Sequence, residues 1–364
     1  MASFVAMIET ITRDRLMALL QSAQRYHVVV MGDAMLDVYL RGDVDRISPE
    51  APVPVVRVRE RRHALGGAAN VANNVLGLGA RCSMVCAVGT DAAGDQLHAM
   101  LTGAGAIVQG VVRVGRPTTT KTRIVARAQQ LVRVDEEEDV DLDGSDIGAL
   151  KDAVRDAVDD ADALVLEDYN KGTLAPSVIH AAITAARAKG IPIVVDPKFR
   201  NFFEFSGASV FKPNRRELEA ALGASVDLDA PEALPATCTR LGVQHLLLTL
   251  GEHGMVLVSA DGEVGRIPTT AREVYDVVGA GDTVTAYLGT MLAAGASAAE
   301  AAVIANFAAG VEVGKLGAAT VSTDEVVDAY DAYHAADRDA DRDADRDADH
   351  DAYHPEHHTQ QSSS

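Results

Sequence analysis

The sequence predicts an α/β fold, doubly wound around a mostly parallel sheet. Short runs of aliphatic and β-branched residues alternate along the chain with longer, alanine-rich segments of helical pattern. Several runs, such as 163–166, are apolar throughout, which is typical of parallel strands that are covered by helices on both faces. With 364 residues, 48% of them hydrophobic, the chain can bury a sizeable core.

The expected elements follow from these patterns in chain order. The strands are predicted at 27–31, 82–88, 163–166, 191–195, 210–211 and 245–250. The helices are predicted at 12–25, 68–78, 95–104, 146–157, 176–189, 214–222, 233–241, 282–294 and 298–315. Thr12 and Asp282 are the expected helix caps, because Thr and Asp side chains accept hydrogen bonds from the first turn of a helix.

Two segments, 43–62 and 118–135, break this rhythm. Both alternate apolar with charged residues, which is the period of strands with one face in water. We expect them to form a small antiparallel sheet that covers the main sheet as a lid. The alternative is a pair of surface hairpins without function; a lid is favoured because closed active sites commonly use one.

Composition limits the class of protein. A net charge of −20 argues against nucleic acid or an anionic membrane as the main partner. No apolar run has the length of a membrane span, and the N-terminal residues have no signal-peptide pattern. Cys82, Cys86 and Cys238 match no disulfide or zinc spacing. We therefore expect a cytoplasmic protein with buried, reduced thiols.

The C-terminal segment 335–364 is expected to be a disordered tail. It repeats Ala-Asp-Arg-Asp and contains almost no apolar residue larger than alanine. Such a composition cannot form a core that offsets the entropy of the chain.

The most informative motif is Gly279-Ala280-Gly281-Asp282, with Asp276 upstream. The glycines let backbone N–H groups approach an anion, and the helix that follows favours negative charge at its N-terminus. Phosphoryl transfer to an alcohol needs both a carboxylate base and such donors. The alternative is that Asp282 only caps the helix. The helix N-terminus should also lower the pKa of Asp282.

Two further segments carry candidate ligands for a polyhydroxylated substrate. Asp33 and Asp37 follow the first predicted strand, at the carboxyl edge where open α/β sheets bind ligands. Gly66 and Gly67 lead into a helix that carries Asn70 one turn inside. Carboxylate and amide groups can bind sugar hydroxyls, although a turn and a helix start would explain each segment equally well.

Asn214 and Glu217 stand three residues apart at the start of a predicted helix. This pair could hold water-coordinated Mg²⁺ and a phosphate oxygen. It also matches a capping box, in which the two side chains cap the helix.

The segment from Thr249 through Gly251 to Gly254 is a strand followed by a glycine turn. It could line a nucleotide site, or it could be a hairpin turn before a further strand at 255–258. Asn306, within an alanine-rich helix, could contact a nucleotide base or serve only a polar helix face.

Taken in chain order, these segments resemble the ribokinase-like carbohydrate kinases, and the resemblance covers residues from about 27 to 324. It implies a ribokinase-like, Rossmann-type kinase domain at 27–325, preceded by an N-terminal helix within 1–26. It further implies ATP and Mg²⁺ as cofactors, with K⁺ as the candidate monovalent ion. A homodimer that pairs through the lid is expected, because lids in this family often pair between subunits.

The resemblance also implies roles for the residues of the motifs. Asp282 would be the base, and Gly279, Ala280 and Gly281 would form the anion hole for the γ-phosphate. The nucleotide side would comprise Asn214, Glu217 with Mg²⁺ bound through water, Thr249, Gly251, Gly254 and Asn306. Asp276 would belong to a monovalent-cation loop. The sugar side would comprise Asp33, Asp37, Gly66, Gly67 and Asn70.

Within the family, the segments 46–55, 116–123, 167–172 and 196–198 are most similar to the kinases of D-glycero-β-D-manno-heptose 7-phosphate. These enzymes phosphorylate the anomeric hydroxyl on the route to ADP-heptose for the lipopolysaccharide core. No His-x-Gly-His nucleotidyltransferase motif follows, so the kinase step alone is expected. A kinase for another phosphosugar or a nucleoside, and a non-catalytic sugar-phosphate sensor, remain alternatives.

The 7-phosphate of such a substrate needs cations in an acidic protein. Lys198 and Lys121 are the first candidates, and Arg123, Arg133 and Arg200 are others near the motifs. Arginine suits bidentate phosphate binding, whereas lysine acts as a point charge.

Overall fold

The computed structural model describes residues 6–8, 11–127, 129–228, 234–271 and 274–336. The predicted disordered tail lies, apart from its first two residues, outside the described residues. No helix in the described ranges is long and apolar enough to cross a bilayer.

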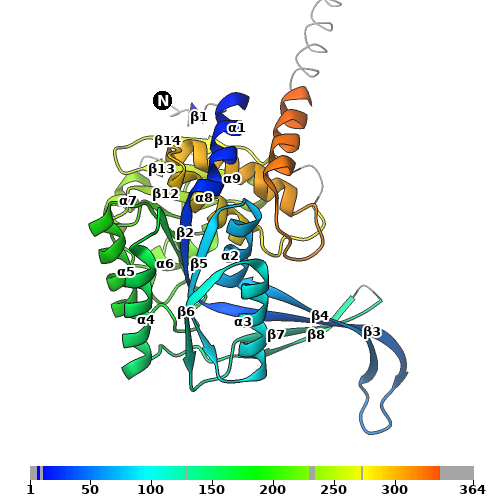
Figure 1. Ribbon diagram of the computed structural model, residues 1–364. Coiled ribbons are helices and arrows are strands. Elements are labelled where there is room, and N and C mark those ends of the chain that lie inside the picture. The colour runs from blue at the N-terminus through cyan, green and yellow to red at the C-terminus, as the bar shows by residue number, and fades with distance from the viewer. Residues whose placement is uncertain (1–5, 9–10, 128, 229–233, 272–273, 337–364) are drawn as a thin grey trace, which may run out of the picture.

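A ten-stranded sheet forms the centre of the molecule (Figure 1), in the order β1-β14-β13-β12-β11-β10-β9-β2-β5-β6. Seven of its strands are parallel neighbours: β2 (His27–Gly32), β5 (Arg81–Gly89), β6 (Ile107–Val114), β9 (Ala163–Glu167), β10 (Ile193–Asp196), β11 (Val210–Phe211) and β12 (His245–Thr249). At one end, β13 (Met255–Ser259) and β14 (Val264–Ile267) continue the sheet antiparallel, and β1 (Ala6–Met7) adds to β14. The predicted parallel core is confirmed, since β2, β9 and β10 are buried along their whole length.

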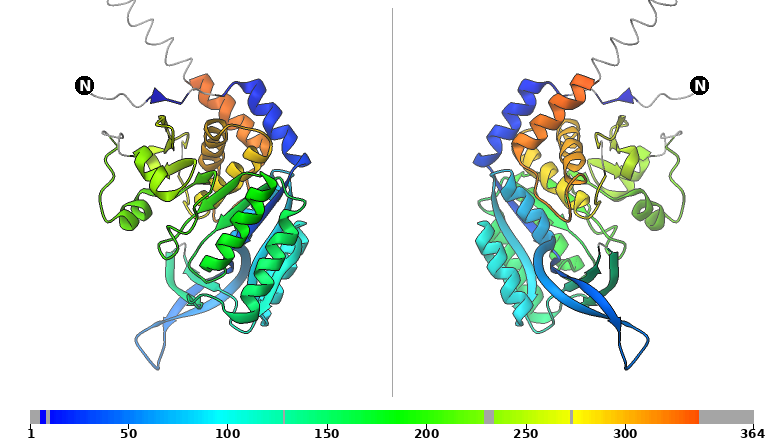
Figure 2. Two further views of the ribbon diagram at one scale, coloured as in Figure 1. Left: turned by 90° about the vertical axis from the view of Figure 1, so that its left-hand side faces the viewer. Right: turned by 90° about the vertical axis from the view of Figure 1, so that its right-hand side faces the viewer.

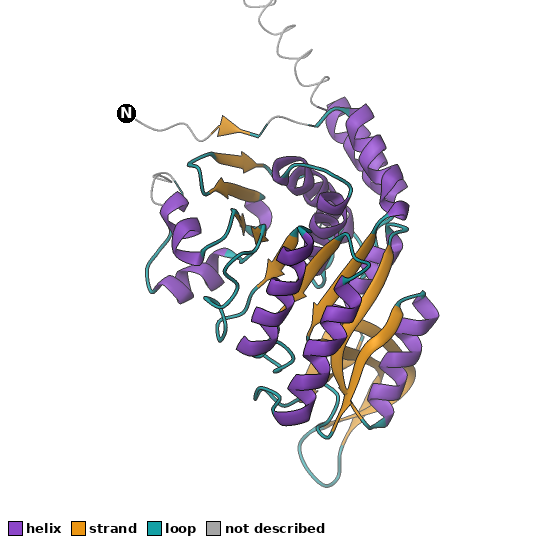
Figure 3. Ribbon diagram, turned by 60° about the vertical axis from the view of Figure 1, so that its left-hand side comes forward, coloured by secondary structure: helices purple, strands orange, loops and turns teal. Residues whose placement is uncertain are grey.

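Helices cover both faces of this sheet (Figure 3). One hydrophobic cluster joins the sheet to α1 (Arg13–Ser22), α2 (Ala68–Gly77), α3 (Ala92–Ala104), α8 (Ala280–Ala293) and α9 (Ala298–Glu312). A second cluster on the other face contains α4 (Gly144–Val158), α5 (Pro176–Lys189), α6 (Arg215–Leu222) and α7 (Leu234–Leu241). A last described helix spans 323–336.

Every predicted strand and helix is present, with boundaries shifted by a few residues. Thr12 caps α1 as expected, since its hydroxyl accepts a hydrogen bond from the backbone of Arg15. α3 begins three residues earlier than predicted because Asp91 caps it through the backbone N–H of Gly94. The sequence analysis does not predict β6, because Gln109 and Gly110 interrupt its run of apolar residues.

The lid is a four-stranded sheet in the order β4-β3-β7-β8. β3 (Ala34–Ile47) pairs with β4 (Pro54–Gly67), and β7 (Thr120–Ala126) pairs with β8 (Gln129–Glu136), each pair antiparallel. The two hairpins join through a parallel pairing of β3 with β7, which the alternation in sequence could not reveal. The long β3–β4 hairpin projects from the body (Figure 2). Because β3 starts two residues after β2 ends, the lid begins at the carboxyl ends of the parallel strands.

Gly289 sets the close approach of α8 to the sheet. A Cβ atom there would lie 2.6 Å from the side chain of buried Val165 on β9, whereas a Cβ at exposed Gly103 near the end of α3 would have no atom within 4 Å. Gly289→Ala should therefore destabilise the fold by about 1–3 kcal/mol through overpacking. Gly103→Ala should stabilise it by up to about 1 kcal/mol because alanine is the better helix former. Urea unfolding of both variants tests this; shifts of the same sign would contradict the packing account.

Candidate active site

Charged side chains gather where the central parallel strands end. Glu167 ends β9, Asp196 ends β10 opposite Glu167, and Lys212 follows β11. The carboxyl ends of parallel strands share one sheet edge, where ligands bind in open α/β folds. The N-terminus of α8 lies at the same edge, since a Cβ atom at Gly281 would lie 3.8 Å from both Asp196 Oδ2 and Lys212 Nζ.

Helix α8 begins at Ala280, and Gly279 is its N-cap residue with a φ of +101°. Asp282 is therefore the third residue of the helix, and the expectation that it caps the helix was wrong. Its carboxylate turns away from the backbone, accepting a hydrogen bond from Asn70 Nδ2 at 2.8 Å and another from the Tyr169 hydroxyl at 2.9 Å. The N–H groups of the first turn have no partner within the helix, so this turn can serve as an anion hole.

The pKa of Asp282 is raised to about 6, opposite to the direction expected from the helix N-terminus. Burial is the main cause, since the residue is only 6% exposed. The hydrogen bonds from Asn70 and Tyr169 lower the pKa, and nearby Asp196 raises it again. Desolvation thus outweighs the helix dipole. Asp282 is a stronger base than an exposed aspartate, yet it is ionised at neutral pH.

Two buried or half-buried lysines line the same cavity as this turn. Lys212, 3% exposed, contacts Asp196 Oδ2 at 2.8 Å through its Nζ atom. Lys198 Nζ contacts Glu217 Oε1 at 2.5 Å and lies 5.1 Å from the centre of the Tyr169 ring. Each ammonium group is paired with an acid, yet both line the cavity beside the first turn of α8, where a transferring phosphate could also contact them.

Glu167 is fully buried, and neither of its carboxylate oxygens has a hydrogen-bond partner among the described residues. Burial raises its pKa well above the usual range, and the charges of Asp196 and Asp282 raise it further. Burial therefore favours the protonated form of Glu167 at this sheet edge.

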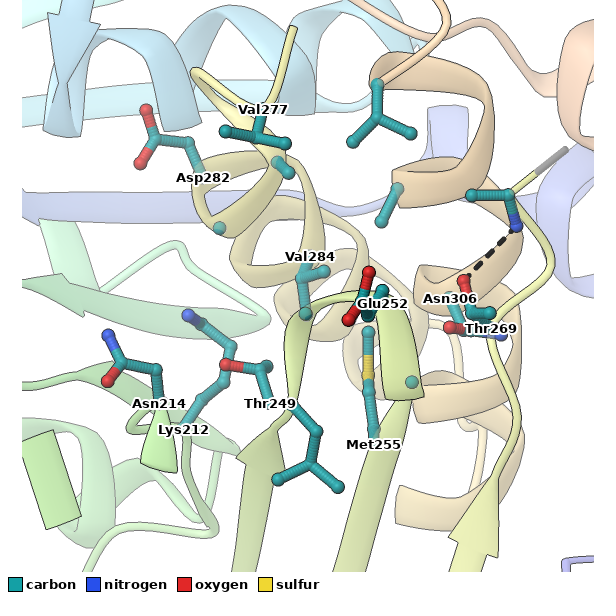
Figure 4. A pocket seen from close by; sticks show the side chains of 18 of the residues that line it. Lys212, Asn214, Thr249, Glu252, Met255, Thr269, Val277, Asp282, Val284 and Asn306 are labelled. Carbon is teal, nitrogen blue, oxygen red and sulfur yellow. Dashed lines mark hydrogen bonds between the residues drawn. The ribbon is translucent and has the colours of Figure 1, made fainter. Parts of the chain in front are cut away.

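A cavity of about 810 Å³ opens beside these groups (Figure 4). Its charged end includes Asp282, Lys212 and Lys198, and its lining is otherwise largely apolar, with Leu250, Met255, Val277, Val284 and Val313. This combination of size, apolar lining and a few convergent polar groups is typical of a small-molecule site.

The structure brings the predicted nucleotide-side residues together around this cavity: Asn214, Glu217, Thr249, Gly251, Gly254 and Asn306 all line it. The glycine turn is also the β12–β13 hairpin of the alternative interpretation. Asn306 donates a hydrogen bond from Nδ2 to the carbonyl of Pro268 at 2.8 Å, so it anchors the wall of the cavity.

Asn214 and Glu217 form the capping box of the alternative interpretation, with two reciprocal hydrogen bonds of 2.9 Å. Both oxygens of Glu217 then have donors, from the Asn214 backbone and from Lys198. The described residues contain no cluster of three acidic, histidine or cysteine ligands for a metal. The predicted role of this pair in holding water-coordinated Mg²⁺ stays a prediction.

Asp276 joins two loops. Its carboxylate accepts hydrogen bonds from the backbone of Val278 at 3.1 Å and of Gly317 at 3.2 Å, beyond the end of α9. Its role in a monovalent-cation loop stays a prediction.

Glu312, to which the sequence interpretation gave no role, lies beside Gly279, and burial raises its pKa to about 8.

On the other side of Asp282, the lid approaches the body. Asp37 of β3 is paired with Arg123 of β7, and a Cβ atom at Gly66 would lie 2.5 Å from the Asp37 carboxylate. Gly67 faces the Tyr169 ring, and Asn70 bonds to Asp282. The predicted sugar-side residues Asp37, Gly66, Gly67 and Asn70 are thus contiguous with the base.

Asp33 has a different environment. Its carboxylate accepts hydrogen bonds from the backbone of Tyr169, Lys171 and Thr173, at 2.9, 2.9 and 3.0 Å. A carboxylate has about four acceptor positions, so most of its capacity holds the loop that positions Tyr169. The contact with sugar that was predicted for Asp33 stays untested.

The structure separates the two lysines predicted to bind the sugar phosphate. Lys198 lines the cavity with Glu217, whereas Lys121 lies on the lid and contacts Glu137 at 2.9 Å. The role of each lysine in binding the sugar phosphate stays a prediction.

The sequence interpretation assigned no role to Tyr169, Glu167, Asp196 or Lys212. The signal that could have found them is their position, because each lies at or just after the end of a buried, continuously apolar strand.

Comparison with known proteins agrees with this geometry. Residues 25–325 match the pfkB family of carbohydrate kinases. The bifunctional protein HldE of Rhodospirillum rubrum is 43% identical over 321 residues, which are 87% of this chain and 65% of that protein. The HldE of Gluconacetobacter diazotrophicus is 45% identical over 311 residues, 85% of this chain and 64% of the relative. The chain thus spans slightly less than two thirds of the length of these relatives.

Solved structures share the fold. Ribokinase of Arabidopsis thaliana, complexed with ribose and ATP, aligns with a TM-score of 0.65 at 22% identity and covers 84% of this chain and 98% of its own. Phosphofructokinase-2 of Escherichia coli, in complex with potassium, aligns with a TM-score of 0.68 at 19% identity, covering 85% and 99%. At these identities the likeness establishes the fold alone.

The raised pKa of Asp282 predicts a cost in stability. The folded state binds a proton at Asp282 up to pH about 6, whereas an unfolded aspartate loses it near pH 4. Stability contributed by this group is therefore present at low pH and is lost between about pH 4 and 6.

Asp282→Asn should accordingly raise the free energy of unfolding at pH 8 by about 1–3 kcal/mol, with the gain vanishing near pH 4. Urea titrations at both pH values test this, with Asp156→Asn on the exposed face of α4 as the matched control. A loss of stability at pH 8 would show that the hydrogen bonds from Asn70 and Tyr169 outweigh the cost of burying the ionised carboxylate.

Proposed function

This chain belongs to the pfkB family of carbohydrate kinases, and from that premise we propose that it transfers the γ-phosphate of ATP to the anomeric hydroxyl of D-glycero-β-D-manno-heptose 7-phosphate. The product would be the 1,7-bisphosphate, on the route to ADP-heptose. The observation that carries the proposal is the buried Asp282, held by Asn70 and Tyr169 between the cavity and the lid. The heptose specificity rests on the segments 46–55, 116–123, 167–172 and 196–198.

Asp282 would accept the proton of the sugar hydroxyl as the bond to phosphorus forms. The hydrogen bonds from Asn70 and Tyr169 fix the orientation of its carboxylate, and the raised pKa makes it a better proton acceptor. Tyr169 itself stays protonated, because burial and the nearby acids raise its pKa well above the usual value. It can therefore remain a hydrogen-bond donor to Asp282 at all physiological pH values.

The first turn of α8, with Lys212 and Lys198, would stabilise the charge on the transferring group. When bound, ATP would supply this group. Glu217 with Asn214 would hold Mg²⁺ through water, and the ion would offset the charge of the other phosphates. The apolar part of the cavity suits a nucleobase. Asp276 would belong to a monovalent-cation loop next to the anion hole, and K⁺ is the candidate ion.

The lid would close over the sugar and would also provide the interface of a homodimer. Apolar Ile47, Val58, Val132 and Val134 are exposed on its strands, and the outer strands β4 and β8 present free edges within the described sheet. A cytoplasmic location follows from the proposed use of ATP.

A non-catalytic sugar-phosphate sensor is the rival from another class. A sensor would not need a carboxylate that is buried at a cost in stability. The raised pKa of Asp282 therefore favours catalysis over sensing.

A substrate screen with an ATP-coupled assay tests the proposal. Heptose 7-phosphate should be turned over, with a kcat/KM at least about tenfold above those of fructose 6-phosphate and ribose, because a site built for several polar groups rejects analogues that leave them unpaired. No turnover of heptose 7-phosphate, alongside turnover of either other sugar, would exclude heptose kinase activity and retain a sugar kinase.

The hydrogen bond from Tyr169 predicts a change in the pH profile. In the wild-type enzyme, kcat/KM should fall below pH about 6 as Asp282 takes up a proton. Tyr169→Phe removes a hydrogen bond that lowers the pKa of Asp282, so the fall should begin at higher pH. Initial rates between pH 5 and 9 measure this, and an unmoved profile would remove Tyr169 from the tuning of the base.

A further inference from the structure

Lys121 and Lys171 share one carboxylate. Lys121 Nζ lies 2.9 Å from Glu137 Oε2, and Lys171 Nζ lies 2.8 Å from Glu137 Oε1. The two ammonium groups thus each contact a different oxygen of the same anion. The side chains of Lys121, Lys171 and Glu137 are 16%, 14% and 26% exposed, so the cluster is mostly buried but remains accessible to solvent.

This cluster lies on the sugar side of Asp282. Lys121 stands opposite Asp37 in the register of β3 with β7. Lys171 is two residues beyond Tyr169, and Asp33 holds the backbone N–H groups of both. A ligand that contacts Tyr169 and Asp37 would therefore have its far end near the two lysines.

Cations outnumber acids among the ion pairs of this cluster. Asp135 lies 3.5 Å from Lys121 but is bound more closely by Arg133, at 2.9 Å. Three cations, Lys121, Lys171 and Arg133, thus face two acids, Glu137 and Asp135. The other cations of the site differ, since Arg123, Lys198 and Lys212 each have an acid of their own.

We propose that Lys121 and Lys171 form the subsite for the phosphate that the sugar substrate already carries, and that Glu137 occupies this subsite until the phosphate displaces it. The inference rests on the proposed function, because it assumes a phosphosugar acceptor. A phosphate monoester has three charged or strongly accepting oxygens and close to two negative charges, against one charge for the carboxylate. It can therefore replace Glu137 on both ammonium groups.

Glu137 can leave without disrupting the lid. β8 ends at Glu136, so Glu137 belongs to the irregular segment 137–143. Other contacts anchor that segment: Arg116 donates a hydrogen bond to the Val140 carbonyl at 2.8 Å, and Arg200 lies 3.4 Å from Asp141. Although burial raises the pKa of Glu137, hydrogen bonds from Lys171 and Lys121 lower it more. Glu137 is therefore ionised at neutral pH, and it competes as an anion.

Kinetics of the full-length chain test the displacement. Glu137→Gln should lower the KM for heptose 7-phosphate by about threefold or more, the equivalent of one partly exposed ion pair. It should leave the KM for unphosphorylated heptose unchanged. Glu138→Gln, the same substitution at the exposed neighbouring residue, should change neither. A KM for heptose 7-phosphate that is unchanged or raised in Glu137→Gln would overturn the inference; a gain in affinity cannot arise from misfolding.

Calorimetry with inorganic phosphate separates this inference from the proposed function. Glu137→Gln should tighten phosphate binding by a similar factor, and Lys171→Gln should weaken it at least as much, with unfolding curves confirming that both variants fold. If phosphate binding follows these changes but heptose 7-phosphate is not turned over, the proposed substrate is wrong and the subsite stands. If heptose 7-phosphate is turned over but neither substitution changes the affinity for inorganic phosphate, the assignment of the subsite is wrong.

Discussion

The burial of the Asp282 carboxylate is the constraint on which the rest of the site depends. Asn70 from α2 and Tyr169 from the loop after β9 each donate to one of its oxygens. These elements are distant in sequence, and only the folded sheet brings them together at the start of α8. Burial raises the pKa of Asp282 to about 6, so the same packing that excludes water from the carboxylate also makes it more basic.

The surrounding residues reduce the electrostatic repulsion among the carboxylates at this edge of the sheet. Lys212 offsets Asp196, Lys198 offsets Glu217, and burial raises the pKa of Glu167, which favours its uncharged form. Uncompensated carboxylates at one sheet edge would repel both one another and a phosphate. Asp33, with three backbone donors, holds the loop that carries Tyr169. The base, its hydroxyl donor and the anion hole thus stand in fixed positions before any substrate binds.

Local patterns predicted much of this molecule. The apolar runs marked the parallel strands, and the Gly-Ala-Gly-Asp turn marked the start of α8, because both depend on residues close in sequence. The partners of Asp282 could not be predicted, since Asn70 and Tyr169 reach it through tertiary packing. The pKa direction was wrong for the same reason: the helix N-terminus is visible in sequence, whereas the depth of burial is not. The parallel pairing of β3 with β7 likewise depends on how two distant hairpins meet.

A direct titration of the Asp282 carboxyl group tests the account most simply. Carbon-13 NMR of protein labelled at the aspartate side-chain carboxyl carbon, compared with the spectrum of Asp282→Asn, isolates this one resonance. The account predicts a midpoint near pH 6 in the ligand-free protein. A midpoint below about pH 4, the ordinary range of an exposed aspartate, would contradict the claim that burial tunes the base.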